Sequence, residues 1–308
     1  MASKSSNIPV TRKSSSKLQA ATQATYQTQT MTRKSAKAKQ SSQNNVTFLE
    51  YRLTKLKYKE VKTNAKIKAL LKHISDTVLQ NKTPHFPIIS EIENNKNTHL
   101  EEISDNEGFQ EFVRFASTNK CSSMLFKNMI LQIMISILSL HHFGVKKQEF
   151  NDIDIEKLTY HKTPCTLSDK RFFHYKIFDE DFYIQDCGYV WIFSAFDKIE
   201  INNYESNEND FITKHKYDYD DEEDDEDEYD ILLHYLHALF HKLGNEHMKK
   251  FINKLIFEKN DAIDSLESEA AFFKRILPLF NQPANTPSVL ANSSPYVIQK
   301  KRMTFSSS

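Results

Sequence analysis

Three histidines on one predicted helix have the spacing of transition-metal ligands. The helical pattern from Ile231 to Phe257 places His234, His237 and His241 at positions i, i+3 and i+7, on one face. Imidazole nitrogens arranged in this way are typical ligands of zinc. Leucine, phenylalanine and tyrosine residues lie beside them, however, and no nearby cysteine completes a tetrahedral set. We therefore expect these histidines to take part in ordinary helix packing, without a metal.

Cysteine content and overall composition limit the classes of protein that remain. Cys121, Cys165 and Cys187 are odd in number and share no C-x-x-C spacing, which argues against a disulfide framework and against a cysteine-based zinc site. The 308 residues carry no net charge and are 39% hydrophobic, which allows one large domain or two lobes. The sequence has no recognisable signal peptide or membrane span, so we expect an intracellular protein without a membrane partner.

An apolar helix and an aromatic hairpin form the centre of the sequence. From Met129 to Leu140 most helix faces are apolar, so we expect this helix to be buried. Its apolar part, about twelve residues, is too short to cross a bilayer. The acidic stretch from Asn151 to Glu156 predicts an exposed loop. Phe172 to Phe178 and Asp181 to Asp186 then predict a hairpin, and Tyr189 to Phe193 a third strand.

Five stretches of this sequence carry a family resemblance. They are Thr83-Pro84-His85-Phe86-Pro87-Ile88, the helix end Ser-Ile-Leu-Ser-Leu-His-His-Phe-Gly at 136–144, Tyr160-His161-Lys162, Tyr-Val-Trp-Ile-Phe-Ser-Ala-Phe-Asp at 189–197, and Pro295-Tyr296-Val297-Ile298. In this order they resemble the protein-kinase-like proteins, a serine/threonine kinase family, of nucleocytoplasmic large DNA viruses. The resemblance extends, with gaps, over roughly residues 60 to 298.

The resemblance implies where a catalytic site would lie. In that family a catalytic loop, His-x-Asp-x-His-x-x-Asn, precedes Tyr-His-Lys, and a strand after the hairpin ends in Asp-Phe-Gly. Counting back from Tyr160, Asp152 falls on the catalytic base and Lys157 on the metal-binding asparagine. Along the last strand, Ala195, Phe196 and Asp197 fall on the three Asp-Phe-Gly positions.

By this resemblance the catalytic site is degenerate. Phosphoryl transfer depends on positioning the phosphates and neutralising their charge with magnesium, which needs hard oxygen ligands. Ala195 has no side-chain oxygen, and Lys157 places a cation where a neutral amide would face the metal. The first glycine of the chain is Gly108, so a glycine-rich phosphate loop is also absent. We expect no cofactor, at most weak ATP binding, and impaired magnesium binding.

The fold implied by the resemblance is α+β, a shortened bilobal kinase-like fold. Residues 46–120 would form a reduced N-terminal lobe and 121–298 a mainly helical C-terminal lobe, followed by a tail at 299–308. The patterns predict one or two strands in Val46 to Tyr58, helices at Glu60 to Lys82, Phe109 to Ala116 and Ala262 to Phe280, a weak strand in Glu91 to Glu107, a break of the Ile231 to Phe257 helix at Gly244, and a surface path for 281–308.

Two segments of opposite charge stand out from the rest. Residues 1–45 contain eight lysines and arginines and no acidic residue, and the stretch 218–230 is acidic at every position except Tyr219 and Tyr229. Neither has enough large apolar side chains to offset the entropy of ordering, so we expect both to be disordered. The first is either a basic arm for nucleic acid or an acidic partner, or a solubilising tail. The second is either an acidic mimic or shield, or a surface insertion.

Together these observations predict a viral pseudokinase that acts as an interaction or regulatory module with protein partners. The first alternative is an atypical serine/threonine kinase that uses Asp152 as its base. The second is a virion-associated or nucleic-acid-associated protein acting through residues 1–45. By the same resemblance, the expected location is the host cytoplasm, at the viral factory, or the virion.

Limited proteolysis tests the two expected disordered segments. Cleavage should occur before residue 46 and within 218–230, because proteases cut exposed unstructured chain, while a resistant core remains. Mass spectrometry of the early fragments identifies the sites. Protection of either segment in the isolated protein would indicate that it is docked instead.

Overall fold

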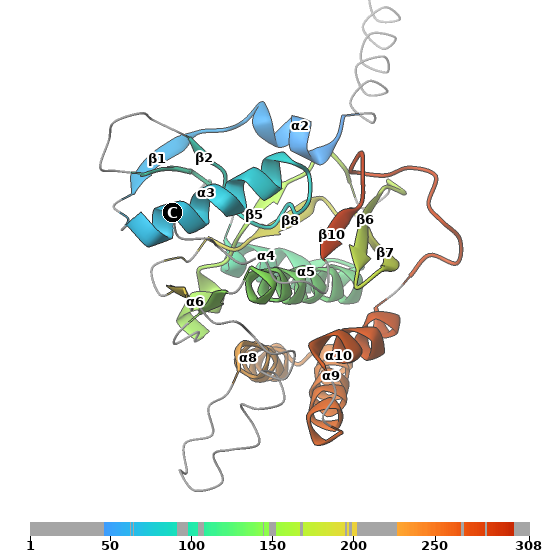
Figure 1. The fold of residues 1–308 in the computed structure, drawn as a ribbon. Coiled ribbons are helices and arrows are strands. Elements are labelled where there is room, and N and C mark those ends of the chain that lie inside the picture. Colours follow the sequence, from blue (N-terminus) through green and yellow to red (C-terminus); the bar gives the residue numbers. More distant parts are fainter. Residues whose placement is uncertain are drawn as a thin grey trace, which may run out of the picture. The chain divides into compact units, whose positions relative to one another are not determined.

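The computed structural model describes residues 46–61, 63, 65–90, 98–103, 108–143, 145–147, 152–166, 169–194, 196, 199–201, 227–265, 268–280 and 282–298. From Thr47 onward the chain forms one compact unit, which mixes helices with small sheets (Figure 1) and confirms the α+β class. The predicted basic arm, 1–45, lies outside the described residues.

Helices and strands alternate irregularly along this unit. The helices are α2 (Phe48–Leu53), α3 (Ala65–Leu79), α4 (Phe109–Thr118), α5 (Ser122–His142), α6 (Asp152–Glu156), α8 (Glu228–Lys242), α9 (Glu246–Asp264), α10 (Glu269–Ile276) and the 3₁₀ helix η1 (Leu277–Leu279). The strands are β1 (Tyr58–Val61), β2 (Ile89–Ser90), β3 (Thr98–Glu101), β4 (Val145–Lys147), β5 (Thr159–Lys162), β6 (Phe172–Ile177), β7 (Glu180–Gln185), β8 (Tyr189–Ile192), β9 (Ile199–Ile201) and β10 (Tyr296–Ile298).

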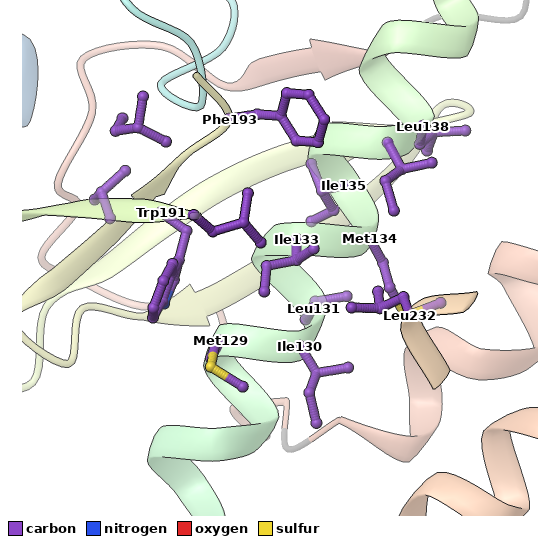
Figure 2. Close-up of a cluster of buried hydrophobic side chains, with 14 of the residues drawn as sticks. Met129, Ile130, Leu131, Ile133, Met134, Ile135, Leu138, Trp191, Phe193 and Leu232 are labelled. Atoms are coloured by element: carbon purple, nitrogen blue, oxygen red, sulfur yellow. The ribbon is translucent and has the colours of Figure 1, made fainter. Parts of the chain in front are cut away.

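Helix α5 is the central element of the core, which confirms the buried helix predicted from Met129 to Leu140. It is longer than predicted, and fifteen of its residues are buried, on all of its faces. The 21-residue helix passes the length and composition test for a membrane span, contrary to our expectation that it is too short. Because 83% of its most apolar window is buried inside the protein, packing alone accounts for its composition. Figure 2 shows its side chains meeting Trp191 and Phe193 on one side and Leu232 of α8 on another.

The N-terminal part of the unit contains a three-stranded antiparallel sheet in the order β1-β3-β2. Strand β3 confirms the weak strand predicted in Glu91 to Glu107. The strands predicted before Tyr58 are wrong, because α2 occupies that stretch. Its capping box, in which the side chains of Thr47 and Glu50 each accept from the other residue's backbone N–H, outweighs the apolar alternation. Helix α3 starts at Ala65, later than the predicted Glu60, because β1 uses Glu60 and Val61.

A second sheet, in the order β10-β6-β7, contains the predicted hairpin. Phe178 and Asp179 both have positive φ, which is the geometry of a two-residue turn that follows the strand twist. The surface path predicted for 281–308 is confirmed for residues 282–290, most of which are exposed, and is wrong for the last described residues. Strand β10 lies parallel to β6, with Tyr296 and Ile298 buried, and Figure 1 shows it beside the hairpin.

Helices α8, α9 and α10 complete the unit. The predicted break at Gly244 is confirmed, and its φ of 65° ends α8 in the left-handed conformation that glycine favours. The continuous helix predicted from Ala262 to Phe280 is wrong, because α9 ends at Asp264 and Ser268 caps a separate α10. The helices predicted at Phe109 to Ala116 and Ile231 to Phe257 correspond to α4 and to α8 with α9.

The end of the acidic stretch is ordered, contrary to its predicted disorder; positions 218–226 lie outside the described residues. Asp227 caps α8, and its side chain accepts from the backbone N–H of Tyr229 and of Asp230. The fully buried Nζ of Lys259 on α9 lies 3.1 Å from Asp227 Oδ2 and 2.5 Å from Asp230 Oδ2. A carboxylate pair around one ammonium therefore fastens the start of α8 to α9.

Replacing Lys259 tests this attachment. Lys259→Met keeps the apolar stem and leaves two carboxylates facing each other, so the free energy of unfolding at neutral pH should fall by about 3 kcal/mol. The matched control is Lys274→Met, whose exposed pair with Glu180 should contribute less than about 1 kcal/mol. Urea denaturation measures both. Equal losses in the two variants would contradict a structural role of the Lys259 pair.

Candidate functional site

Two antiparallel strand pairs flank the two chain segments that contain the predicted site residues. Strand β4 pairs with β9, with Lys147 opposite Ile199, and β5 pairs with β8, with Thr159 opposite Ile192. The chain from Lys147 to Thr159 and the chain from Ile192 to Ile199 therefore join the same ends of the two pairs. These are the stretches in which Asp152, Lys157 and the 195–197 triplet lie.

Polar side chains of α5 hold β8 in register. Gln132 Oε1 accepts from the backbone N–H of Trp191 (2.9 Å), and Gln132 Nε2 donates to the carbonyl of Tyr189 (3.2 Å). Asn128 Nδ2 donates to the carbonyl of Gln185 at the end of β7 (2.7 Å). Gln132, which interrupts the apolar pattern of α5, and Asn128 one turn earlier therefore fix the strands that lead to the candidate site.

The buried Thr83-Pro84-His85-Phe86-Pro87-Ile88 segment fixes the end of that strand. The backbone N–H of Phe193 donates to the carbonyl of His85 (2.8 Å). The ring of His85 bonds to the carbonyl of Trp191 through Nδ1 and to the hydroxyl of Tyr175 through Nε2, both at 2.9 Å. Since a carbonyl can only accept, Nδ1 carries the proton and Nε2 accepts from the tyrosine. Burial lowers the pKa of His85 to about 4, so the ring is neutral at pH 7.

Three of the five predicted site residues are at least partly described. Asp152 is the first residue of α6, and its side chain lies outside the described residues, as do Ala195 and Asp197. Lys157 follows α6 and is exposed. Phe196 is buried and packs edge-to-face on Phe193, with ring centroids 6.2 Å apart. The resemblance also implies that Asp152 and Ala195 face one cleft, and this remains a prediction.

The exposed loop predicted from Asn151 to Glu156 is wrong where the structure describes it. Asp152 to Glu156 form α6, in which Asp154 and Ile155 are buried. Glu156 accepts a hydrogen bond from the hydroxyl of Tyr235 on α8 (3.0 Å). Burial of Ile155 and contact with α8 stabilise a helix that its acidic composition concealed.

A buried ionic network, which no sequence pattern predicted, joins β3 to α2 and β5. Glu101 at the end of β3 binds Arg52 of α2 through both carboxylate oxygens and accepts from His161 Nε2 of β5 at 2.9 Å. Burial alone would raise the pKa of Glu101, but the charge of Arg52 and the hydrogen bonds from His161 and Arg52 lower it to about 2. The partners are 49 and 60 residues apart in sequence, so no local spacing reveals them.

A second, half-buried network joins the end of α5 to α8 and α10. His141 Nδ1 lies 2.8 Å from Glu269, and His141 Nε2 lies 3.3 Å from Glu228. Tyr229 donates its hydroxyl to the same oxygen of Glu269 (2.7 Å). Burial opposes the charge of His141, but the two carboxylates raise its pKa to about 10, so the imidazole is protonated at neutral pH. This network positions helices and lies outside the two stretches that enclose the candidate site.

The candidate metal histidines are not assembled into a site in the described part of the chain. His234 and His241 are exposed, His237 is half-buried, and none of the three is in the apolar face of α8. Among the described residues no three histidine, cysteine, aspartate or glutamate side chains gather as a metal would require. The expectation of no cofactor stays a prediction.

Comparisons with known proteins add no assignment. No protein-family model, no curated protein and no solved structure matches this chain. The chemistry of the candidate site therefore has to be argued from its own residues.

The neutral state of His85 predicts a pH dependence of stability. An unfolded histidine titrates near pH 6.5 and His85 near 4, so the folded state binds fewer protons between these values and stability falls as pH drops through this window. His85→Gln retains one donor and one acceptor but does not titrate. The difference in unfolding free energy between the wild type and His85→Gln should shrink by about 2 kcal/mol from pH 7 to pH 5. A difference independent of pH would contradict a neutral, buried His85.

Proposed function

We propose that this chain is a degenerate kinase-like protein, a pseudokinase that acts through interactions with other proteins. One observation supports the proposal: because β4 pairs with β9 and β5 pairs with β8, the chain segments 147–159 and 192–199 join the same ends of these two strand pairs. A kinase needs this juxtaposition, because its catalytic base and its magnesium ligands must face the same phosphates. At the two metal-ligand positions this sequence has Lys157 and Ala195, so the metal ligands are lost while the arrangement of the chain is retained.

The N-terminal sheet supports the proposal of a bilobal kinase-like fold. In kinases a strand bearing the phosphate-binding lysine precedes the helix with its paired glutamate. Here β1, which carries Lys59, precedes α3, and β3 lies between β1 and β2 in the sheet. The described part of α3 carries lysine and histidine in place of a central glutamate, and no glycine precedes Gly108. Both the ion pair and the glycine-rich cover of a working nucleotide site are therefore missing from the sequence.

The residues at the proposed metal positions favour a catalytically inactive protein over an active kinase. Ala195 offers no oxygen, and the exposed Lys157 supplies a positive charge where magnesium would have to bind. A lysine ammonium can stand beside phosphate as a point charge, which allows weak nucleotide binding without a metal. The alternative function is an atypical kinase with Asp152 as base, and a role for residues 1–45 in nucleic-acid or virion association is compatible with either.

Nucleotide titrations of the full chain test the proposal. ATP binding, measured by thermal shift and calorimetry, should be weak and nearly indifferent to magnesium, because no carboxylate at position 195 recruits the metal. Ala195→Asp combined with Lys157→Asn should make binding at least about tenfold tighter with magnesium than without it. Ala195→Asn combined with Lys157→Asn is the matched control, since it restores the shape without the charge, and it should stay indifferent.

Phosphoryl transfer decides between the two readings. The unaltered protein should transfer no labelled phosphate to a general substrate or to itself, and Asp152→Asn should leave its partner binding unchanged. Robust magnesium-dependent transfer that disappears in Asp152→Asn would overturn the pseudokinase proposal and establish Asp152 as a general base.

A further inference from the structure

The outer side of α9 and the turn before it carry an excess of positive charge. Between His241 and Phe257 the sequence has four lysines, Lys242, Lys249, Lys250 and Lys254, and a single acidic residue, Glu246. We call Lys250, Lys254 and Phe257, which are exposed and lie three to four residues apart on α9, the α9 outer face. Residues at this spacing are neighbours on one side of a helix.

The charges of this face are not neutralised within the described part of the chain. Neither Lys250 nor Lys254 has an acidic partner there, and the pair of Lys249 with Glu246 is loose at 3.8 Å. The acidic residues further along α9, Glu258 and Asp261, both bind Arg275 of α10. The basic and acidic parts of α9 are therefore separated, and the basic part faces solvent.

A neighbouring helix adds another cation. Lys127 of α5 has its Nζ 4.3 Å from the ring centroid of Phe251 and donates to the carbonyl of Leu279 (3.4 Å). Burial and the charge of Lys254 both lower the pKa of Lys127, which places the two ammonium groups close enough to repel each other.

Phe257 is the most exposed large apolar side chain among the described residues. Its exposed fraction is 65%, while the apolar face of α9 is packed into the core. An interfacial helix needs a broad apolar face to enter a lipid surface, and α9 has only this ring left. An isolated aromatic ring one turn from Lys254 and two turns from Lys250 instead matches the combination of stacking platform and cations found in single-strand-binding proteins.

We propose that the α9 outer face binds single-stranded nucleic acid, with Lys250 and Lys254 contacting phosphates and Phe257 stacking on a base. The inference does not depend on the kinase-like proposal. It also concerns a surface different from residues 1–45, which the sequence singled out as a basic arm.

Fluorescence anisotropy of the full chain with a labelled oligothymidylate tests the proposal. Lys250→Gln with Lys254→Gln should weaken binding by about tenfold and reduce the slope of log affinity against log salt by about 1.4, since each phosphate contact on a single strand contributes about 0.7. Phe257→Ala should weaken binding by about fivefold or more without changing that slope, because stacking releases no counterions.

The control replaces two exposed lysines elsewhere, Lys120→Gln with Lys170→Gln. This control removes the same charge and leaves residues 1–45 and the α9 outer face unchanged. Its affinity for the oligothymidylate should therefore stay within about twofold of wild type. Equal loss in the control, an unchanged affinity in Phe257→Ala, or no binding at low salt would overturn the proposal. So would Phe257-dependent binding to phosphatidylserine vesicles in the absence of oligonucleotide binding. Circular dichroism of each variant confirms that the fold is retained.

Discussion

The buried pair of Arg52 and Glu101 is the interaction on which the arrangement around the candidate site depends. Both side chains are almost completely inaccessible, so their removal from water is costly unless every polar atom finds a partner. Glu101 accepts from Arg52, from His161 and from the backbone N–H of Ile88. The pair therefore joins α2, β3, β5 and the segment before β2 at one point. Removing either partner would leave the other charge buried alone, which is strongly destabilising.

Arg52 also solves a problem created by the proline-containing segment. Thr83 to Ile88 is buried but forms no regular strand, so its carbonyls need donors from elsewhere. Arg52 Nη1 donates to the carbonyl of Pro84 and Arg52 Nη2 to that of Phe86. The segment thus held presents His85 to Trp191 and Phe193. A side chain on the short helix α2 in this way holds the segment that bonds to the end of β8.

Local patterns predicted the elements whose stability is local or whose burial is complete. The apolar run of α5, the aromatic hairpin and the break at Gly244 each follow from side-chain type and spacing along a few residues. Helix α2 failed because apolar alternation was given more weight than the Thr47 and Glu50 capping pair. Predictions also failed wherever polar sequence is ordered by distant partners.

Asp227 and Asp230 illustrate this limit, as do the residues of the candidate site. The sequence predicts that the two aspartates are solvated charges. In the structure Lys259, about thirty residues away, supplies their counter-ion. The sequence predicts that Tyr296 lies in a surface tail, whereas in the structure it pairs with the edge of β6. For the candidate site, Asp152, Lys157 and 195–197 were assigned by resemblance, and the strand pairing shows only that segments 147–159 and 192–199 join the same ends of two strand pairs. The positioning roles of His161 and His85 follow only from their hydrogen-bond partners in the structure.

The position of β10 has a consequence for the way this protein is made. Strand β10 pairs with β6, more than one hundred residues earlier, and the backbone N–H of Phe48 donates to the carbonyl of Ala291 close by. The first helix of the unit and its central hairpin therefore complete their hydrogen bonds only with residues 291–298. During synthesis the edge of β6 stays open until the C-terminal residues leave the ribosome, and non-local closure of this kind is slow. Until residues 296–298 pair with it, this edge of β6 presents unpaired backbone groups that other chains could bind.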